Sequence, residues 1–281
     1  MVSGKCTFNA GGHQGLPGTP GTFVAIPGNC EHSFTVDEPD THILNFYLPA
    51  GFEQILIGIS HPAKRREPPP PELIGEMMPP PELVKKLSED YGMTSMIEDP
   101  LIDGPDPARM LTKPTPGAKS FPFTANAASE DLVSYWALGG LWTILASGNQ
   151  TGSYILMEQH LPKGVAANPH LHTSNEEVFY ILDGRMTFLL GDRIQTARQG
   201  ALIFVPRGTV HAVRVDSETA HVLNLHSPAG FERLADLIGT PTKEKSMPPN
   251  TFKAKEVDPA VEARLLNSIG LCNVALANPL A

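Results

Sequence analysis

Cysteine is scarce in this chain of 281 residues. Cys6, Cys30 and Cys272 are far apart, odd in number and without any CxxC spacing, which argues against a disulfide framework and against a zinc ribbon. Reduced thiols are the simpler interpretation, and they are typical of an intracellular protein. The sequence therefore predicts a cytoplasmic location.

Long apolar runs and clustered positive charge are also missing. No apolar stretch approaches the about 20 residues that a membrane span needs, and residues 1–20 lack the apolar core of a signal peptide. Apart from Lys64, Arg65 and Arg66 the basic residues are scattered, and the net charge is −9. We therefore expect neither a membrane nor a nucleic acid as a partner.

Proline, in contrast, is abundant: the chain has 28, about twice the average share. Many of them fall in residues 61–122, which predicts a partly extended connector with one short helix over residues 81–91. On either side, short runs rich in Val, Ile, Phe, Tyr and Leu alternate with turn formers, as is typical of an all-β sandwich or barrel. A further helix is predicted after Asp258, where it would pack across the outside of a barrel.

The chain also repeats itself. Residues 21–60 and 200–239 align without a gap at an offset of 179, so that His32 corresponds to His211 and the word PAGFE recurs in full. Chance does not produce such a match over 40 residues. The sequence therefore indicates an internal duplication, with two related β-domains on either side of the connector.

Four potential metal ligands stand at the ends of three predicted strands. In an extended strand residues i and i+2 face the same side, so His170 and His172 point together. Glu177 lies on the next strand, and the turn at residues 206–208 precedes a strand that begins near His211. The four side chains can therefore converge inside one barrel.

Three imidazoles and one carboxylate suit one divalent transition metal, namely Fe, Mn, Co, Ni, Cu or Zn, with one or two positions open for water or substrate. A lone histidine is more often structural, but here the spacing is specific. The pattern is G-x5-HxH-x4-E-x6-G from Gly164 to Gly184, followed by G-x5-P-x-G-x2-H from Gly200 to His211. The pair of motifs predicts a metal site with an open position for chemistry.

The remaining acidic and histidine candidates are interpreted differently. Strand alternation allows only one of two adjacent carboxylates to face inward, and Glu177 keeps the six-residue spacing to Gly184, so we expect Glu176 to be solvated. Five other histidines lie outside the motif positions and are expected to be surface or structural residues: His42, His61, His160, His221 and His226.

The two motifs resemble the signature of the cupin superfamily, small β-barrels of the jelly-roll or double-stranded β-helix type. The repeated PAGFE, the proline-rich connector and the stretch at residues 135–164 are together similar to the bicupins of the quercetin 2,3-dioxygenase-like group. In that group the glutamate at the position of Glu177 is a metal ligand and also the base for a substrate hydroxyl. The resemblance thus implies that His170, His172, Glu177 and His211 hold the metal and that Glu177 is catalytic.

The implied reaction is dioxygenation, with O2, of a flavonol-like or other phenolic or polyketide-like hydroxy-carbonyl compound. Two alternatives are open. A cupin with similar ligation can act without oxygen as an isomerase, cyclase or decarboxylase, in which the ion is only a Lewis acid. A cupin can also bind a small molecule without catalysis.

The first domain departs from the resemblance. Residues 3–12 fall on residues 183–192 in the self-alignment, so Gly4 corresponds to Gly184 and the chain begins where the first motif ends. Of the four donors only the last has a counterpart, His32. The first domain is therefore not expected to complete a metal site from its own residues.

Three explanations are open for this departure: a truncated start, a degenerate half-barrel, and completion by a second subunit. The abrupt position of Met1 inside a motif favours the first, and a truncated start would also remove a signal peptide. The first domain lacks the strands that would close its barrel, so its sheet edges are expected to be exposed. A second copy of the chain could cover these edges, which predicts a homodimer. The expected division is residues 1–60, a partial cupin domain; 61–122, the connector; 123–240, the metal-binding cupin domain; and 241–281, a tail with a helix.

Overall fold

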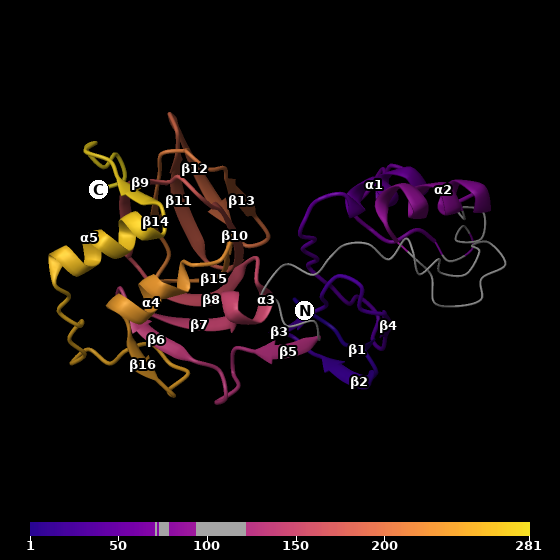
Figure 1. The fold of residues 1–281 in the computed structure, drawn as a ribbon, viewed down its shortest axis with the longest axis horizontal. Helices are drawn as coiled ribbons and strands as arrows, with labels where there is room; N and C mark the ends of the chain where they lie inside the picture. The colour runs from indigo at the N-terminus through magenta and orange to yellow at the C-terminus, as the bar shows by residue number, and fades with distance from the viewer. Residues whose placement is uncertain (71, 73–78, 94–121) are drawn as a thin grey trace. The chain divides into compact units, whose positions relative to one another are not determined.

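The computed structural model describes residues 1–70, 72, 79–93 and 122–281 (Figure 1). The chain divides into two compact units. The larger comprises residues 1–27 and 32–42 together with the barrel after residue 122, and the smaller comprises residues 28–31 and the described part of 43–113. Most of the regular structure is β-strand, which confirms the all-β prediction. No helix among the described residues is both long enough and apolar enough to cross a membrane.

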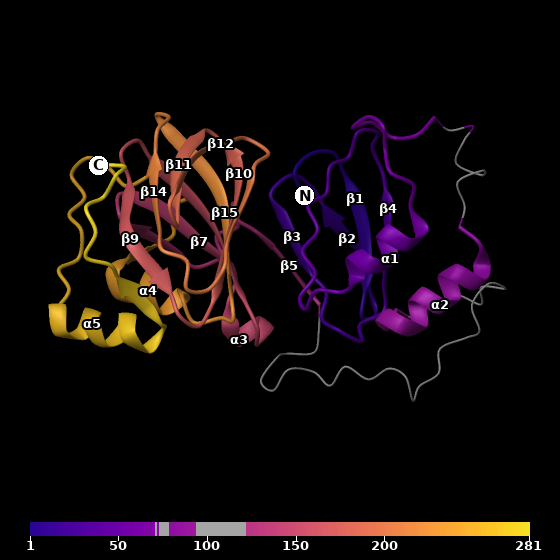
Figure 2. The same ribbon diagram turned by 90° about the horizontal axis from the view of Figure 1, so that it is seen from above.

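Two antiparallel sheets face each other in the barrel of the larger unit, as Figures 1 and 2 show. This is the expected jelly roll. In order across the seven-stranded sheet lie β13 (Leu202–Val205), β10 (Glu176–Asp183), β15 (Thr219–Ser227), β8 (Ile155–Pro162), β7 (Gly140–Ala146), β6 (Ser134–Ala137) and β16 (Thr240–Thr242). The five-stranded sheet consists of β12 (Arg193–Arg198), β11 (Arg185–Leu190), β14 (His211–Val215), β9 (Ala166–His172) and β17 (Leu271–Asn273).

The hydrophobic core fills the space between these two sheets. Strand alternation sends Phe179 and Ile181 of β10 inward, where Phe179 packs on Phe188 of β11 with ring centroids 5.2 Å apart. Ile181 and Phe188 have no exposed surface, and each such side chain stabilises the fold by about 1.5–3 kcal/mol. The same alternation places Glu177 on this inward face, at the end of β10.

Three short helices accompany the barrel: α3 (Gly148–Thr151), α4 (Glu232–Ile238) and α5 (Pro259–Ser268). The helix predicted after Asp258 is confirmed as α5, since the Asp258 carboxylate accepts a hydrogen bond of 2.7 Å from the backbone N–H of Ala260. Leu265 and Leu266 of α5 pack against the core cluster. The helix therefore covers the outside of the barrel, as the sequence indicated.

The first repeat contributes short strands to the same unit. In one sheet β1 (Cys6–Ala10) lies between β2 (His13–Gly18) and β4 (His32–Val36). In another, β3 (Thr22–Ala25) pairs with β5 (Phe123–Asn126), which follows the connector. The sequence did not predict this pairing between residues about 100 positions apart. The division of the chain at residues 60, 122 and 240 stays a prediction.

The smaller unit contains two helices that pack on each other. The predicted helix over residues 81–91 is confirmed as α2 (Pro81–Tyr91), which ends at Gly92 with a left-handed φ of 72°. A Cβ on Gly58 of α1 (Phe52–Ile59) would lie only 2.4 Å from Leu87 of α2. A larger residue at this position would therefore force the Leu87 side chain to move. Most of the connector's second half, residues 94–121, lies outside the described residues.

The end of the chain also joins the barrel. The sequence indicated only a tail with a helix, but β17 pairs with β9, the strand that carries His170 and His172. Val274 N–H donates to the Pro169 carbonyl and Thr173 N–H donates to the Gly270 carbonyl. By the alternation of an antiparallel ladder, Cys272 and Leu171 between them form a hydrogen-bonded pair. Strand β17 thus covers an edge that β9 would otherwise expose.

We predict that Cys272→Pro destabilises the barrel whereas Cys272→Ser does not. Proline removes the N–H that pairs with Leu171, and a lost hydrogen bond of this kind costs about 1–3 kcal/mol. The Cys272 side chain is exposed, so serine keeps the ladder and serves as the matched control. Thermal unfolding of both variants measures the difference. Equal unfolding temperatures would show that β17 contributes nothing to the stability of the sheet.

Candidate metal centre

The four predicted donors meet at one end of the barrel. His170 and His172 lie at the end of β9, Glu177 at the start of β10 and His211 at the start of β14. The register pairs His211 directly with His170. One ligand atom from each side chain lies within 4.8 Å of every other. The structure therefore brings together all four residues that the motif spacing singled out.

Glu177 is the centre of this group. Its Oε2 lies 3.1 Å from Nε2 of His211 and 3.3 Å from Nε2 of His172, and all three residues are buried. Burial alone would raise the pKa of Glu177, but the charges and hydrogen bonds of the surrounding imidazoles outweigh it and hold the pKa well below its usual range. The carboxylate is therefore ionised at neutral pH.

Two of the histidines are oriented by the backbone. Nδ1 of His170 lies 2.8 Å from the Asn168 carbonyl, and Nδ1 of His211 lies 2.9 Å from the Thr209 carbonyl. A carbonyl only accepts hydrogen bonds, so each Nδ1 carries a proton, and Nε2 is the atom that would bind a metal ion after losing its own proton. Without an ion, the protonated Nε2 of His211 donates to Glu177 Oε2 at 3.1 Å. Such backbone acceptors commonly fix the tautomer of metal-ligating histidines.

The surroundings of His172 show whether these side chains suit a metal ion. His172 is 2% exposed, its Nδ1 has no hydrogen-bond partner, and its Nε2 lies 3.3 Å from Glu177 Oε2 without hydrogen-bond geometry. A buried polar atom without a partner costs about 1–3 kcal/mol, and ligation of a divalent ion through Nε2 would offset that cost. Three imidazole nitrogens and one carboxylate oxygen match the donor preferences of the later first-row metals. The donor set therefore fits one divalent transition metal.

Two side chains that the sequence interpretation missed complete the group. Nδ2 of Asn224 donates to Oε1 of Glu177 at 2.9 Å, and Nε2 of His226 lies 3.3 Å from the same oxygen. Of the two roles expected for His226, surface or structural, the structure shows the second: it is fully buried beside Glu177 and lies outside the four-donor group. The available signal was alternation, since Asn224 and His226 share the face of Val222, which lies in the core.

The repeated word PAGFE has a role here as well. Its phenylalanine, Phe231, stacks on His226 with ring centroids 3.8 Å apart and an interplanar angle of 8°. The same ring meets His172 edge-on at 5.9 Å. Phe231 thus forms an apolar wall on which both imidazoles are held.

The neighbouring carboxylate points away from this group. Oε1 of Glu176 forms an ion pair of 2.8 Å with Nε of Arg207. A third of the Glu176 side chain is exposed, against 6% for Glu177. The expectation that only Glu177 faces inward is confirmed.

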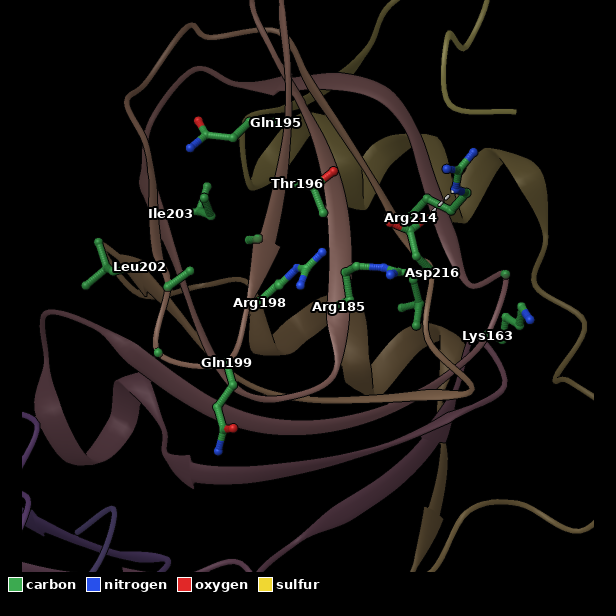
Figure 3. A pocket seen from close by; sticks show the side chains of 15 residues that line it. Lys163, Arg185, Gln195, Thr196, Arg198, Gln199, Leu202, Ile203, Arg214 and Asp216 are labelled. Atoms are coloured by element: carbon green, nitrogen blue, oxygen red, sulfur yellow. Dashed lines mark hydrogen bonds and ion pairs between the residues drawn. The ribbon is translucent and has the colours of Figure 1, made fainter.

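A cavity of about 1130 Å³ in the barrel contains none of the four donors. Figure 3 shows its lining, which comes from β11 to β14, the adjoining turns and Lys163, with Arg185 and Arg198 opposite each other across β11 and β12. Arg214 in the same cavity is paired with Asp216. The lining offers cations but no histidine or cysteine, so this cavity is not the metal site.

The first repeat supplies no equivalent centre among the described residues. His32, the counterpart of His211, lies on β4 and is exposed. No group of three or more potential ligands in the described part of the chain includes it. This agrees with the absence of the HxH motif from the first repeat.

We predict that metal-free protein loses stability as the pH falls from about 6.5 to about 4, and that His170→Gln flattens this loss. Burial, then the charge of His211, lowers the pKa of His170 to about 4. The unfolded chain takes up the proton near pH 6.5, before the folded chain does, so the free energy of unfolding falls by about 3 kcal/mol across this window. Urea unfolding at several pH values, after chelation, measures it. His61→Gln is the control, and parallel curves for wild type and His170→Gln would contradict the assignment.

Comparisons with known proteins agree with this geometry. Residues 157–226 match the family described as "Cupin domain". A curated quercetin 2,3-dioxygenase of Bacillus subtilis is 23% identical over 248 residues, which cover 86% of this chain and 69% of the relative.

Solved structures that are similar to parts of the chain include KdgF from a Halomonas species, with 20% identity, a TM-score of 0.32 and coverage of 34% of this chain and 85% of that one. A mutant of Bacillus subtilis oxalate decarboxylase has 19% identity and a TM-score of 0.33, and the match covers 36% of this chain and 28% of that one. The family match and the curated relative confirm the resemblance drawn from the two motifs: the chain contains a cupin domain over residues 157–226 and is similar over 86% of its length to a quercetin 2,3-dioxygenase.

Proposed function

We propose that this chain is a mononuclear metal-dependent dioxygenase acting on a flavonol-like or other phenolic compound with a hydroxyl beside a carbonyl. The observation that carries the proposal is the convergence of three imidazoles on an ionised, buried carboxylate. The similarity to a quercetin 2,3-dioxygenase over 86% of the chain supports the substrate class. A small phenolic substrate and O2 are the partners this reaction requires.

His170, His172, Glu177 and His211 would hold the ion. A bound divalent ion supplies Lewis acidity, which lowers the pKa of a substrate hydroxyl and makes its ring more electron-rich toward O2. The identity of the metal follows from supply as much as from these donors, because imidazole and carboxylate accept most of the later first-row series.

Glu177 would also take the proton of the substrate hydroxyl. Its Oε1 is held by Nδ2 of Asn224, and its Oε2 faces His172 and His211. A carboxylate fixed at both oxygens needs no reorganisation before it accepts a proton. His226, stacked on Phe231, keeps water away from the inner side of the carboxylate, since both rings are buried.

A metal-binding experiment tests the ligand set first. Elemental analysis of the wild type and of His170→Ala/His172→Ala is expected to differ by about one ion per chain, because two of four ligands are lost. His42→Ala/His61→Ala, which removes two histidines outside the four-donor group, is the matched control and is expected to retain the wild-type content. Equal metal content in wild type and the HxH variant, after reconstitution with Fe, Mn, Co, Ni, Cu or Zn, would refute the site.

Catalysis by Glu177 is tested with one substitution at two adjacent positions. Glu177→Gln is expected to lower turnover of quercetin about 10²- to 10⁴-fold, the usual contribution of a general base. Glu176→Gln, at the outward-facing neighbour, is expected to leave turnover unchanged. Oxygen uptake and metal content are measured together, so that loss of the base is separated from loss of the ion.

Three other outcomes are informative. Unchanged turnover in metal-loaded Glu177→Gln would exclude the proposed base. Turnover under anaerobic conditions would favour an isomerase, cyclase or decarboxylase. Tight binding of quercetin without turnover, by a metal-loaded wild type, would favour a binding protein.

A further inference from the structure

A second group of potential ligands lies on the other face of the seven-stranded sheet. Glu158 and His160 are two residues apart on β8, and His221 lies directly opposite His160 on β15. Met157 and Val222, their chain neighbours, belong to the core between the two sheets. Because adjacent residues of a strand face opposite sides, Glu158, His160 and His221 point away from that core and from Glu177.

The three side chains converge on one oxygen atom. Oε1 of Glu158 lies 2.9 Å from Nε2 of His221 and 3.6 Å from Nε2 of His160. The two imidazoles are stacked, with centroids 3.9 Å apart and an interplanar angle of 21°. Both Nε2 atoms therefore approach the carboxylate from the same side, and all three ligand atoms lie within 4.8 Å of one another.

One imidazole of this group is not satisfied by the protein. The Glu158 side chain is 8% exposed, and the positive groups that act on it are the two imidazoles and the Met1 ammonium. Nε2 of His221 is buried and makes no hydrogen bond of acceptable geometry, although it lies close to Glu158. An ion between the two imidazoles and the carboxylate would satisfy both atoms at once.

The chemistry and the access both suit a metal. Two imidazoles and one carboxylate are a donor set that zinc and other later first-row divalent ions accept, with further positions left for water. The backbone that carries them lies in the interior of the seven-stranded sheet, between β10 and β7, so the spacing is rigid. The His160 side chain is 44% exposed and that of His221 is 29% exposed, which gives an ion a route from solvent.

We propose that Glu158, His160 and His221 form a second divalent-metal site, separate from the four-donor site and on the opposite face of the same sheet. It is a three-ligand, partly exposed site, so it binds zinc more weakly than the buried group of four. The proposal does not depend on the dioxygenase reaction, since none of its residues belongs to that site.

Zinc titration in a background without the first site tests the proposal. His170→Ala/His172→Ala is expected to bind about one equivalent of Zn²⁺, and adding His160→Gln and His221→Gln is expected to abolish it. The matched control adds His13→Gln and His61→Gln, two exposed histidines, to the same background. It is expected to bind the same one equivalent of Zn²⁺. Equal binding with and without His160 and His221 would overturn the proposal.

Site-specific modification of the wild type gives an answer that does not require the background variant to fold. Diethyl pyrocarbonate modifies exposed imidazoles, and peptide mass spectrometry reports each histidine separately. Zn²⁺ is expected to protect His160 and His221 but not His61. Protection lost in Glu158→Gln would link it to the carboxylate, whereas equal modification of His160 with and without Zn²⁺ would overturn the proposal.

Discussion

The structure of the barrel depends on one buried carboxylate. Moving a carboxylate out of water costs several kcal/mol unless other groups compensate, and Glu177 is 5% exposed. His172, His211 and Asn224 compensate for it from three different strands. The register that pairs His211 with His170 is therefore a chemical requirement as well as a feature of the sheet. A slip of one residue would turn these groups toward solvent.

Local patterns in the sequence predicted an all-β sandwich or barrel, the four donors and the helices at residues 81–91 and after Asp258, because spacing and capping are properties of short segments. The jelly roll was implied by the resemblance of the two motifs to cupins. The missed features are all non-local. Alternation places Asn224 and His226 on the same face as Val222, but the strands beside β15 decide that this face points inward and that it meets Glu177. The three residues of β17 are too few for a period to show, and only tertiary pairing with β9 makes them a strand.

The central strands β8 and β15 support polar groups on both of their faces. Asn224 and His226 of β15 face Glu177, whereas His221 of the same strand faces Glu158. The sheet is thus not a simple boundary between a polar outside and an apolar core. Each polar cluster instead requires its own compensating partners. The clusters are linked through β15, which carries residues of both and is hydrogen-bonded to β8.

The two copies of PAGFE show how a repeat can keep its packing while its chemistry changes. Phe52 stacks on Tyr47 with centroids 4.2 Å apart, as Phe231 stacks on His226, and in both copies the partner lies five residues before the phenylalanine. One copy has a phenol where the other has an imidazole. In this chain the stacked phenylalanine is therefore common to both halves, and the residue five positions upstream is what distinguishes them.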